Sequence, residues 1–247
     1  MTPVLVDPFE QGDDSGSIRD SGEGGEGDKN INGDESFDEE WQMNIIQERK
    51  EDGTIGLDFD NYQSRVDDCT VRKIFNQETL KGKKVTRIAL GGCINITDIT
   101  ADIISTHCNS LEIVGLRGCH NLTDAGIAAI ISNNSQLGVI IISYCFRATN
   151  ESINAVVSGC PRIEEIVAIG VGFTSLPEDM FDILPRLVYL NLSKNKISRL
   201  PKSIIRMSNE CHIFLSGNPL KYPPLETVEQ GMGAITSYFK HHRQLGV

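Results

Sequence analysis

The spacing of three cysteines constrains this chain more than any other feature of its sequence. Cys93, Cys119 and Cys145 follow one another at steps of 26 residues, and each is preceded by the pattern apolar-x-x-apolar-x-apolar, as in LEIVGL before Cys119. The same frame continues to Val171 and Asn195. A unit of this length cannot bury its apolar face alone. The sequence therefore predicts a stack of similar units in which each covers the next.

Two stretches, CINITDITADIISTHCNSL and CHNLTDAGIAAIISNNSQL, share the pattern C-x-x-[IL]-T-D followed by apolar residues at helical spacing. With their period they resemble the cysteine-containing leucine-rich repeats of F-box substrate adaptors. The next units, FTSLPEDMFDILPRLVYLNLSKN and ISRLPKSI, resemble the shorter typical repeats, and GNPLKYPPLETVEQGMGAITSYF resembles the closing segment of cytosolic Ras-regulatory and Roco proteins. This resemblance implies an α/β leucine-rich repeat solenoid, a short curved horseshoe with a parallel concave sheet and with helices and irregular segments on its convex side.

Composition and periodicity divide the chain into four predicted segments. Residues 1–38 are strongly acidic and contain few large apolar side chains, which predicts a disordered acidic tail. Residues 39–80 are predicted to hold an N-terminal capping helix and a degenerate first repeat, with a free partner-binding helix as the alternative for the first part. We expect leucine-rich repeats over residues 81–219 and a C-terminal capping helix over residues 220–247.

Capping residues and apolar spacing predict where the helices lie. Thr97, Thr123 and Thr149 precede apolar residues at spacings of three and four, which predicts one convex helix in each cysteine-type unit. The spacing of Trp41 and Ile45 predicts a short helix within the first part of the N-terminal cap. Leu-Pro pairs in the later units predict shorter and less regular segments.

Composition disfavours several classes of function. The formal net charge of −11 argues against sequence-independent binding of nucleic acid, which depends on neutralising phosphates. No apolar stretch is long enough for a membrane-spanning helix, and the N-terminal MTPVLVDPFEQGDD does not resemble a signal peptide. We therefore expect a soluble monomer that does not insert into membranes and is cytoplasmic, with the nucleus as the alternative compartment.

The residues that commonly carry chemistry do not form a recognisable site. The seven cysteines follow the repeat spacing, so they are expected to be buried thiols, and no Cys-x2-Cys pair suggests zinc. No Ser/His/Asp or Cys/His set, phosphate-binding glycine loop or pair of carboxylates recurs at corresponding positions. The sequence therefore predicts no metal, no cofactor and no enzymatic activity.

The repeat frame also predicts which side chains cover the concave sheet. Side chains alternate along a strand, so the x residues around the second and third apolar positions of each unit point away from the core. Apolar side chains there form a contiguous patch of the kind that marks a partner site, with arginine and tyrosine around it. The predicted partner-binding residues are Arg87, Ile113, Arg117, Val139, Ile141, Tyr144, Glu165, Val167, Ile169 and Tyr189.

These observations predict a non-enzymatic interaction module that holds a protein partner on its concave face. The resemblance of the closing segment implies a signalling scaffold. The cysteine-type repeats imply the alternative, a substrate-recognition adaptor of a ubiquitin ligase, although the sequence has no F-box that would link it to a ligase. The patch also has two simpler interpretations, because the N-terminal segment could fold back over it, or its β-branched residues could merely satisfy strand propensity.

Overall fold

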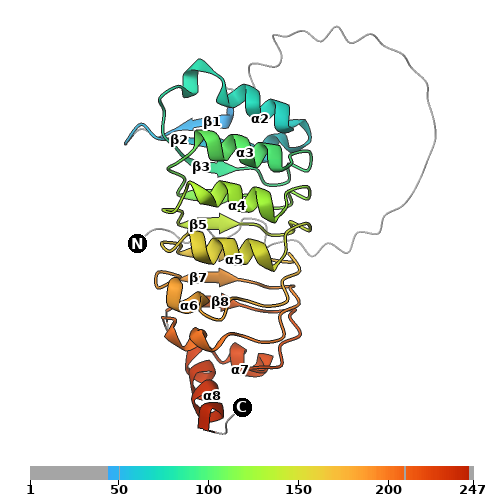
Figure 1. The fold of residues 1–247 in the computed structure, drawn as a ribbon, viewed down its shortest axis with the longest axis vertical. Helices are drawn as coiled ribbons and strands as arrows, with labels where there is room; N and C mark the ends of the chain where they lie inside the picture. The colour runs from blue at the N-terminus through green and yellow to red at the C-terminus, as the bar shows by residue number, and fades with distance from the viewer. Residues whose placement is uncertain (1–43, 50, 209, 245–247) are drawn as a thin grey trace, which may run out of the picture. The chain divides into compact units, whose positions relative to one another are not determined.

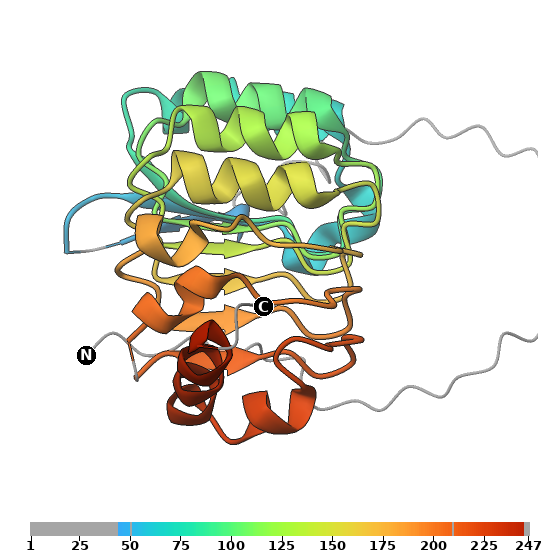
Figure 2. The ribbon, with the colours of Figure 1, turned by 60° about the horizontal axis from the view of Figure 1, so that its bottom comes forward.

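The computed structural model describes residues 44–49, 51–208 and 210–244, with side chains as far as His241. The predicted acidic tail at residues 1–38 lies outside the described residues. In the described part, eight strands form one open sheet in sequence order, and helices cover one of its faces (Figure 1). This is an α/β arrangement of two layers, with the apolar core between them (Figure 2).

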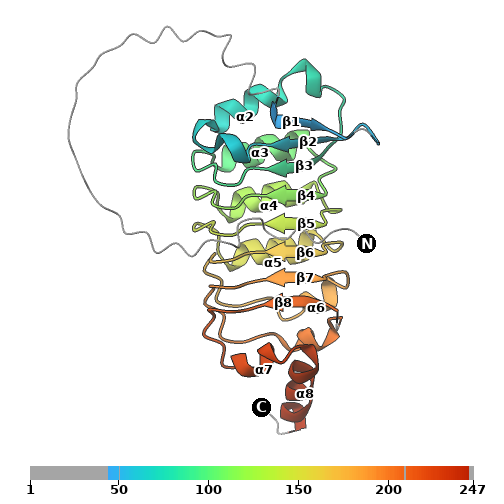
Figure 3. The same cartoon turned by 180° about the vertical axis from the view of Figure 1, so that it is seen from behind.

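Each unit of the sequence repeat supplies one short strand, and consecutive strands lie side by side (Figure 3). The second apolar position of each unit lies level with its counterparts, and Ile88, Val114 and Ile140 at this position are fully buried. β1 is antiparallel to β2, and every later neighbouring pair is parallel. The strands are β1 (Ile46–Glu48), β2 (Ile55–Asp58), β3 (Val85–Ala89), β4 (Ile113–Gly115), β5 (Val139–Ile141), β6 (Glu165–Val167), β7 (Tyr189–Asn191) and β8 (His212–Phe214).

The connections between strands form the helical layer. Regular α-helices occur in the first units, and only short turns of helix follow the Leu-Pro pairs at 176–177 and 200–201, as predicted. Proline disfavours helix at the residue before it, which agrees with the non-helical backbone of Leu176 and Leu200. The elements are η1 (Asp60–Arg65), α2 (Asp68–Phe75), η2 (Glu78–Leu80), α3 (Asp98–His107), α4 (Asp124–Ser132), α5 (Asn150–Gly159), α6 (Met180–Ile183) and η3 (Lys202–Arg206).

A ladder of capping interactions joins the first turns of neighbouring helices. Thr97, Thr123 and Thr149 each accept a hydrogen bond from the backbone N–H two residues on, which confirms the predicted helix starts. The backbone N–H and hydroxyl of Thr123 donate to Asp98, and those of Thr149 donate to Asp124, so each cap ties its helix to the helix before it.

Gly126 marks the tightest point of this ladder. At the equivalent position of the preceding helix, Thr100 donates its hydroxyl hydrogen to Asp68. Gly126 instead lies so close to the Asp98 carboxylate that a Cβ atom would collide with it. A side chain at this position would therefore require the Asp98 carboxylate to shift.

Cysteine in the earlier units and asparagine in the later ones form equivalent hydrogen bonds at the turn after the strand. The thiol of Cys119 donates to the carbonyl oxygen of Leu90 over 3.0 Å, and Nδ2 of Asn195 donates to the equivalent oxygen of Ala168 over 2.7 Å. Asn195 also accepts from the backbone N–H of Phe173 at 3.0 Å. Both residue types thus satisfy a backbone group of the preceding unit inside the core, where an unpaired carbonyl would be costly.

The N-terminal cap differs from the expected helix. Ile46–Glu48 is an edge strand, so the expectation of a helix continuing through these residues was wrong. Of the expected helix, only Asn44 and Ile45 have helical backbone among the described residues. Trp41 lies outside the described residues. Pairing with β2 satisfies backbone groups that an uncovered sheet edge would leave open. This gain outweighs the weak helical spacing of a short segment.

The first and last units otherwise follow the sequence pattern. Leu57 lies level with Ile88, as expected for a degenerate first repeat. At the other end, α7 (Leu225–Glu229) and α8 (Met232–Gln244) replace the single predicted helix, because Gly231 between them has a φ of +87°. Ile235 and Phe239 of α8 are buried, as their spacing predicts.

Candidate partner-binding face

The face of the sheet opposite the helices is called here the sheet face (Figure 3). Register places Arg87, Ile113, Val139, Glu165 and Tyr189 level with one another on successive strands. The neighbouring column brings Ile141 beside Val167. Arg117, Tyr144 and Ile169 follow the C-terminal ends of β4, β5 and β6. The structure therefore brings all ten predicted residues onto one side of the sheet and its adjoining edge.

Exposure across the sheet face is uneven. Val167 and Ile169, predicted as exposed members of the apolar patch, are only 4% and 9% exposed. Neighbouring strands lie about 4.8 Å apart, so large side chains on adjacent strands cover one another. Ile113, Val139 and Ile141 are half-buried. The accessible apolar surface therefore lies mainly over β4 and β5, and the expectation that Val167 and Ile169 are exposed was wrong.

Charged groups on this face are partly compensated. Burial raises the pKa of Asp60, although the backbone N–H of Gly91, which donates to it over 2.6 Å, and the nearby Arg87 oppose that rise. Burial also raises the pKa of Glu165, and the adjacent Glu164 adds to the effect. A cationic group of a partner would favour the ionised form of Glu165.

An aromatic and cationic group, called here the edge cluster, lies where the strands β4 and β5 pass into the helical layer. It consists of Arg117, His120, Tyr144 and Phe146. The Arg117 guanidinium lies over the Tyr144 ring at 5.5 Å, and the centroid of Phe146 lies 4.9 Å from that of His120 and 6.3 Å from that of Tyr144. Phe146 is 61% exposed. Such an aromatic side chain held by its neighbours is typical of a binding anchor.

Tyr144 adopts an unusual backbone conformation in this cluster. Its φ is +59°, in a position that Gly118 and Gly170 occupy in the units on either side, with φ of +71° and +64°. The left-handed region is unfavourable for a bulky residue and is frequent for glycine. Gly170 also leaves room for the Tyr144 ring, because a Cβ at Gly170 would lie 2.8 Å from Cε1 of that ring. The fold thus holds Tyr144 in an unfavourable backbone conformation, with its ring packed against Gly170.

His120 and Phe146 were not among the predicted binding residues. Both stand immediately after a cysteine of the repeat, at the position that Ile94 occupies one unit earlier, and Ile94 is 48% exposed. The sequence could have indicated these two residues, because a large side chain follows each of the three repeat cysteines. The concave-sheet argument did not include that position because it lies in the loop after the strand.

A second aromatic pair lies at the other end of the sheet face. The rings of Tyr189 on β7 and Phe214 on β8 have centroids 5.3 Å apart, and Phe214 is 41% exposed. Phe214 lies in the same column as Val167 and was not included in the predicted site. The accessible apolar and aromatic surface therefore has two ends, the edge cluster and this pair, with Ile141 between them.

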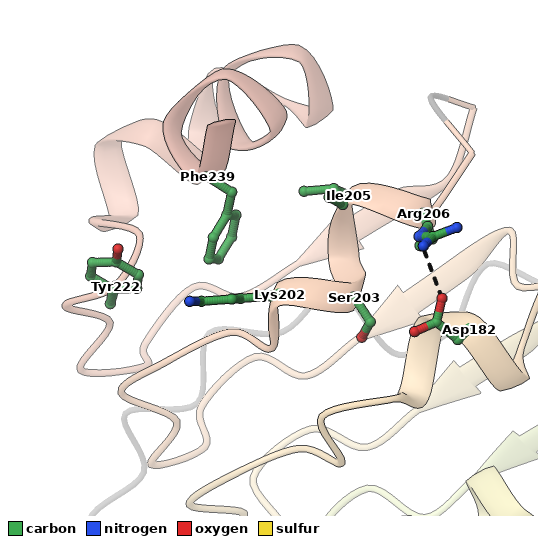
Figure 4. A pocket seen from close by; sticks show the side chains of 7 residues that line it. All are labelled: Asp182, Lys202, Ser203, Ile205, Arg206, Tyr222 and Phe239. Atoms are coloured by element: carbon green, nitrogen blue, oxygen red, sulfur yellow. Dashed lines mark ion pairs between the residues drawn. The ribbon is translucent and has the colours of Figure 1, made fainter. Parts of the chain in front are cut away.

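A pocket of about 250 Å³ lies in the helical layer near the C-terminus (Figure 4). It is bounded by α6, η3, the loop before α7, and α8. Its lining residues are Asp182, Lys202, Ser203, Ile205, Arg206, Tyr222 and Phe239. None of these residues belongs to the predicted site.

The His, Cys, Asp and Glu side chains of the described residues are spread over the fold. No group of three or more His, Cys, Asp or Glu side chains among them is placed to hold a metal ion. Burial raises the pKa of the Cys93, Cys108 and Cys145 thiols to about 12, which suppresses the thiolate form that a nucleophile needs. Across the same residues no helix has the length and apolar character to cross a membrane.

Comparison with known proteins identifies no family. No protein-family description and no curated protein matches the chain. Among solved structures, the chain is similar to one in the crystal structure of the Rad7 and Elc1 complex in yeast, with a TM-score of 0.44 and 18% sequence identity. The match covers 53% of this chain and 34% of the other, so this chain spans about a third of that protein.

Proposed function

We propose that this protein is a leucine-rich repeat interaction module without enzymatic activity that binds a protein partner across the sheet face and the edge cluster. The observation that carries the proposal is the edge cluster itself. The exposed Phe146 ring packs against both Tyr144 and His120, and the Arg117 guanidinium lies over the Tyr144 ring. Tyrosine and arginine in packed clusters supply much of the binding energy of known interfaces.

Continuity with the sheet face supports a protein ligand over a small molecule. Ile113, Val139 and Ile141 adjoin the edge cluster on β4 and β5, and in the described part of the chain no helix covers them (Figure 3). An open sheet gives a broad and shallow contact area, whereas small-molecule sites are concave and enclose their ligand. A partner with a complementary apolar surface would bury this area.

The two aromatic ends of the surface set the size of the partner's contact. Phe146 follows β5, whereas Phe214 lies on β8, three strand spacings away. At about 4.8 Å for each spacing this is roughly 14 Å across the strands, and Phe146 also lies beyond the end of β5, which lengthens the path. The partner would therefore need an extended segment of more than about four residues to reach both ends.

A signalling scaffold and a ubiquitin-ligase adaptor remain the two specific versions of this role. Both would use the same surface, and they differ in what the partner is attached to. Affinity capture from a cell extract, followed by mass spectrometry, distinguishes them. Recovery of ligase subunits would support the adaptor, and recovery of a GTPase or kinase would support the scaffold.

The same capture tests the surface. Phe146→Ala combined with Ile141→Ser removes the exposed anchor and a half-buried neighbour while leaving the core residues in place. Ile99→Ser is the matched control, because Ile99 is 49% exposed but lies on α3 in the helical layer. We expect the double variant to lose the partners that the wild type and the control retain. Partners held equally by all three proteins would exclude this surface.

A further inference from the structure

The pocket near the C-terminus has room for a single side chain. Its volume of about 250 Å³ is below the range of roughly 300 to 1,000 Å³ that is usual for small-molecule sites. The rings of Tyr222 and Phe239 and the side chain of Ile205 supply apolar walls. An aromatic side chain of a partner matches both the size and the chemistry of this space.

The aromatic walls are held in place by their neighbours. Tyr222 packs edge-on against Phe239, with 5.9 Å between the ring centroids, and against Tyr238 at 5.2 Å. The guanidinium of Arg199 lies over the Tyr222 ring at 5.4 Å. Edge-to-face contacts of this kind favour one ring orientation. The pocket is therefore organised before any ligand enters.

The charged residues that line the pocket are two cations, Lys202 and Arg206, and one carboxylate, Asp182, so their net charge is positive. Figure 4 shows the Phe239 ring pointing from α8 towards the Lys202 side chain, whose ammonium extends towards Tyr222. No ion pair of Lys202 is found among the described residues, whereas Arg206 lies 3.6 Å from Asp182. The Lys202 ammonium is thus available to a carboxylate that enters beside an aromatic ring.

The surrounding chain strengthens this preference for an anionic partner. Residues 186–247 contain 9 Lys and Arg against 3 Asp and Glu. Positive surface raises the local concentration of anionic ligands and speeds their association. The pocket lies in the helical layer, so a ligand there would not compete directly for the sheet face.

We propose that this pocket is a second binding site, which takes an aromatic side chain flanked by carboxylates from an acidic segment of a partner protein. The ring would lie between Phe239, Tyr222 and Ile205. A neighbouring carboxylate would pair with Lys202. The site is independent of the sheet face and of the edge cluster.

Direct titration of the full chain with a fluorescent pentapeptide, Asp-Asp-Phe-Glu-Asp, tests this site. At low ionic strength we expect saturable binding, measured by fluorescence anisotropy, that Lys202→Glu weakens about tenfold or more through charge reversal. The peptide Asp-Asp-Ala-Glu-Asp, which has the same charge and no ring, should bind about tenfold more weakly because it buries less apolar surface. Inorganic phosphate at equal ionic strength should compete no better than chloride.

Two matched variants separate the pocket from general charge and from the proposed partner surface. Lys196→Glu makes the same charge change at an exposed lysine of the same basic segment that does not line the pocket, and it should leave the affinity within about twofold. Phe146→Ala should also leave peptide binding unchanged, whatever it does to partner capture. Equal binding of the two peptides, equal loss in the two lysine variants, or full displacement by phosphate would overturn the proposal.

Discussion

The carboxylate of Asp98 accepts hydrogen bonds from both the backbone N–H and the hydroxyl of Thr123, at 2.9 and 2.6 Å. Asp98 begins one helix, and Thr123 caps the next, so this pair joins two repeat units at the start of their helices. Replacing Thr123 by valine keeps the shape of the side chain but removes its hydroxyl group. That hydroxyl caps its own helix and donates to Asp98, whereas the backbone N–H remains. We expect a loss of about 2 kcal/mol in the free energy of unfolding, measured by urea denaturation. Thr106→Val is the control, because the exposed Thr106 hydroxyl bonds only within its own helix, and an equal loss in both variants would contradict the role of the pair.

Acidification should destabilise the protein through the same ladder. Burial alone would raise the pKa of Asp68 and Asp124, but hydrogen bonds from Thr100 and Ser152 and from the helix caps lower both values below the usual range. Because the folded pKa is lower than the unfolded pKa, the stabilisation is present above about pH 4 and is lost as the pH falls through the folded value. The double variant Asp68→Asn/Asp124→Asn should be less stable at pH 7 and should show a flatter decline below pH 4. Parallel stability curves for variant and wild type would argue against this linkage.

One cysteine should react in the native protein, although the chain has seven. Cys69 is exposed, and the other six thiols are buried. Burial raises the pKa of Cys211 to about 12 and that of Cys160 to about 11, so few thiolates form. Ellman's reagent at pH 8 should therefore detect one fast thiol before unfolding and seven after it. The variant Cys69→Ser should abolish the fast phase, and its persistence would show that a core thiol is accessible.

Two buried serines should respond to alanine in opposite directions. The Ser203 hydroxyl oxygen is buried and has no hydrogen-bond partner among the described residues, so Ser203→Ala should stabilise the fold by about 1 kcal/mol. Ser152 donates to the Asp124 carboxylate, so Ser152→Ala should destabilise it by about 2 kcal/mol. Thermal or urea unfolding of the two variants measures the difference. Destabilisation by both would mean that Ser203 has a bonding role.

Glycine substitutions at Tyr144 and Lys194 separate the effect of the left-handed backbone conformation on stability from the effect of the Tyr144 side chain on partner binding. Both are non-glycine residues with positive φ, +59° and +57°. Lys194→Gly should stabilise the protein by roughly 0.5 kcal/mol, because relief of the left-handed conformation exceeds the entropy cost of glycine. Tyr144→Gly should be close to neutral for stability, since the same relief is offset by lost contacts with Arg117 and Phe146, yet it should weaken partner binding about tenfold. Unchanged capture of the partner by Tyr144→Gly would remove the edge cluster from the binding site.

The periodic part of the fold could be read from the sequence because its determinants are local. The pattern around Cys119 places Val114 inward and Ile113 outward within one strand, and Thr123 sets the start of the next helix through atoms two residues away. The equivalence of cysteine and asparagine at the turn also follows from their shared place in the period. The expectation of a helix at Ile46–Glu48 failed because these residues pair with the open edge of β2. That edge offers backbone hydrogen bonds that stabilise a strand more than a short helix would be stabilised.

Within the repeats, the sequence by itself determined the order of strands and helices, their register and the identity of the outward columns, because each depends on spacing within a single unit. Only the tertiary structure decided which outward side chains remain accessible. Val167 and Ile169 are covered by neighbours on adjacent strands, whereas Phe146, beside a buried cysteine, stays exposed. The pocket behind Lys202 likewise arises from segments that are distant in the chain. The exposure of a side chain depends on the side chains that the neighbouring units place within a few ångströms of it. The spacing of residues within one unit does not determine those contacts.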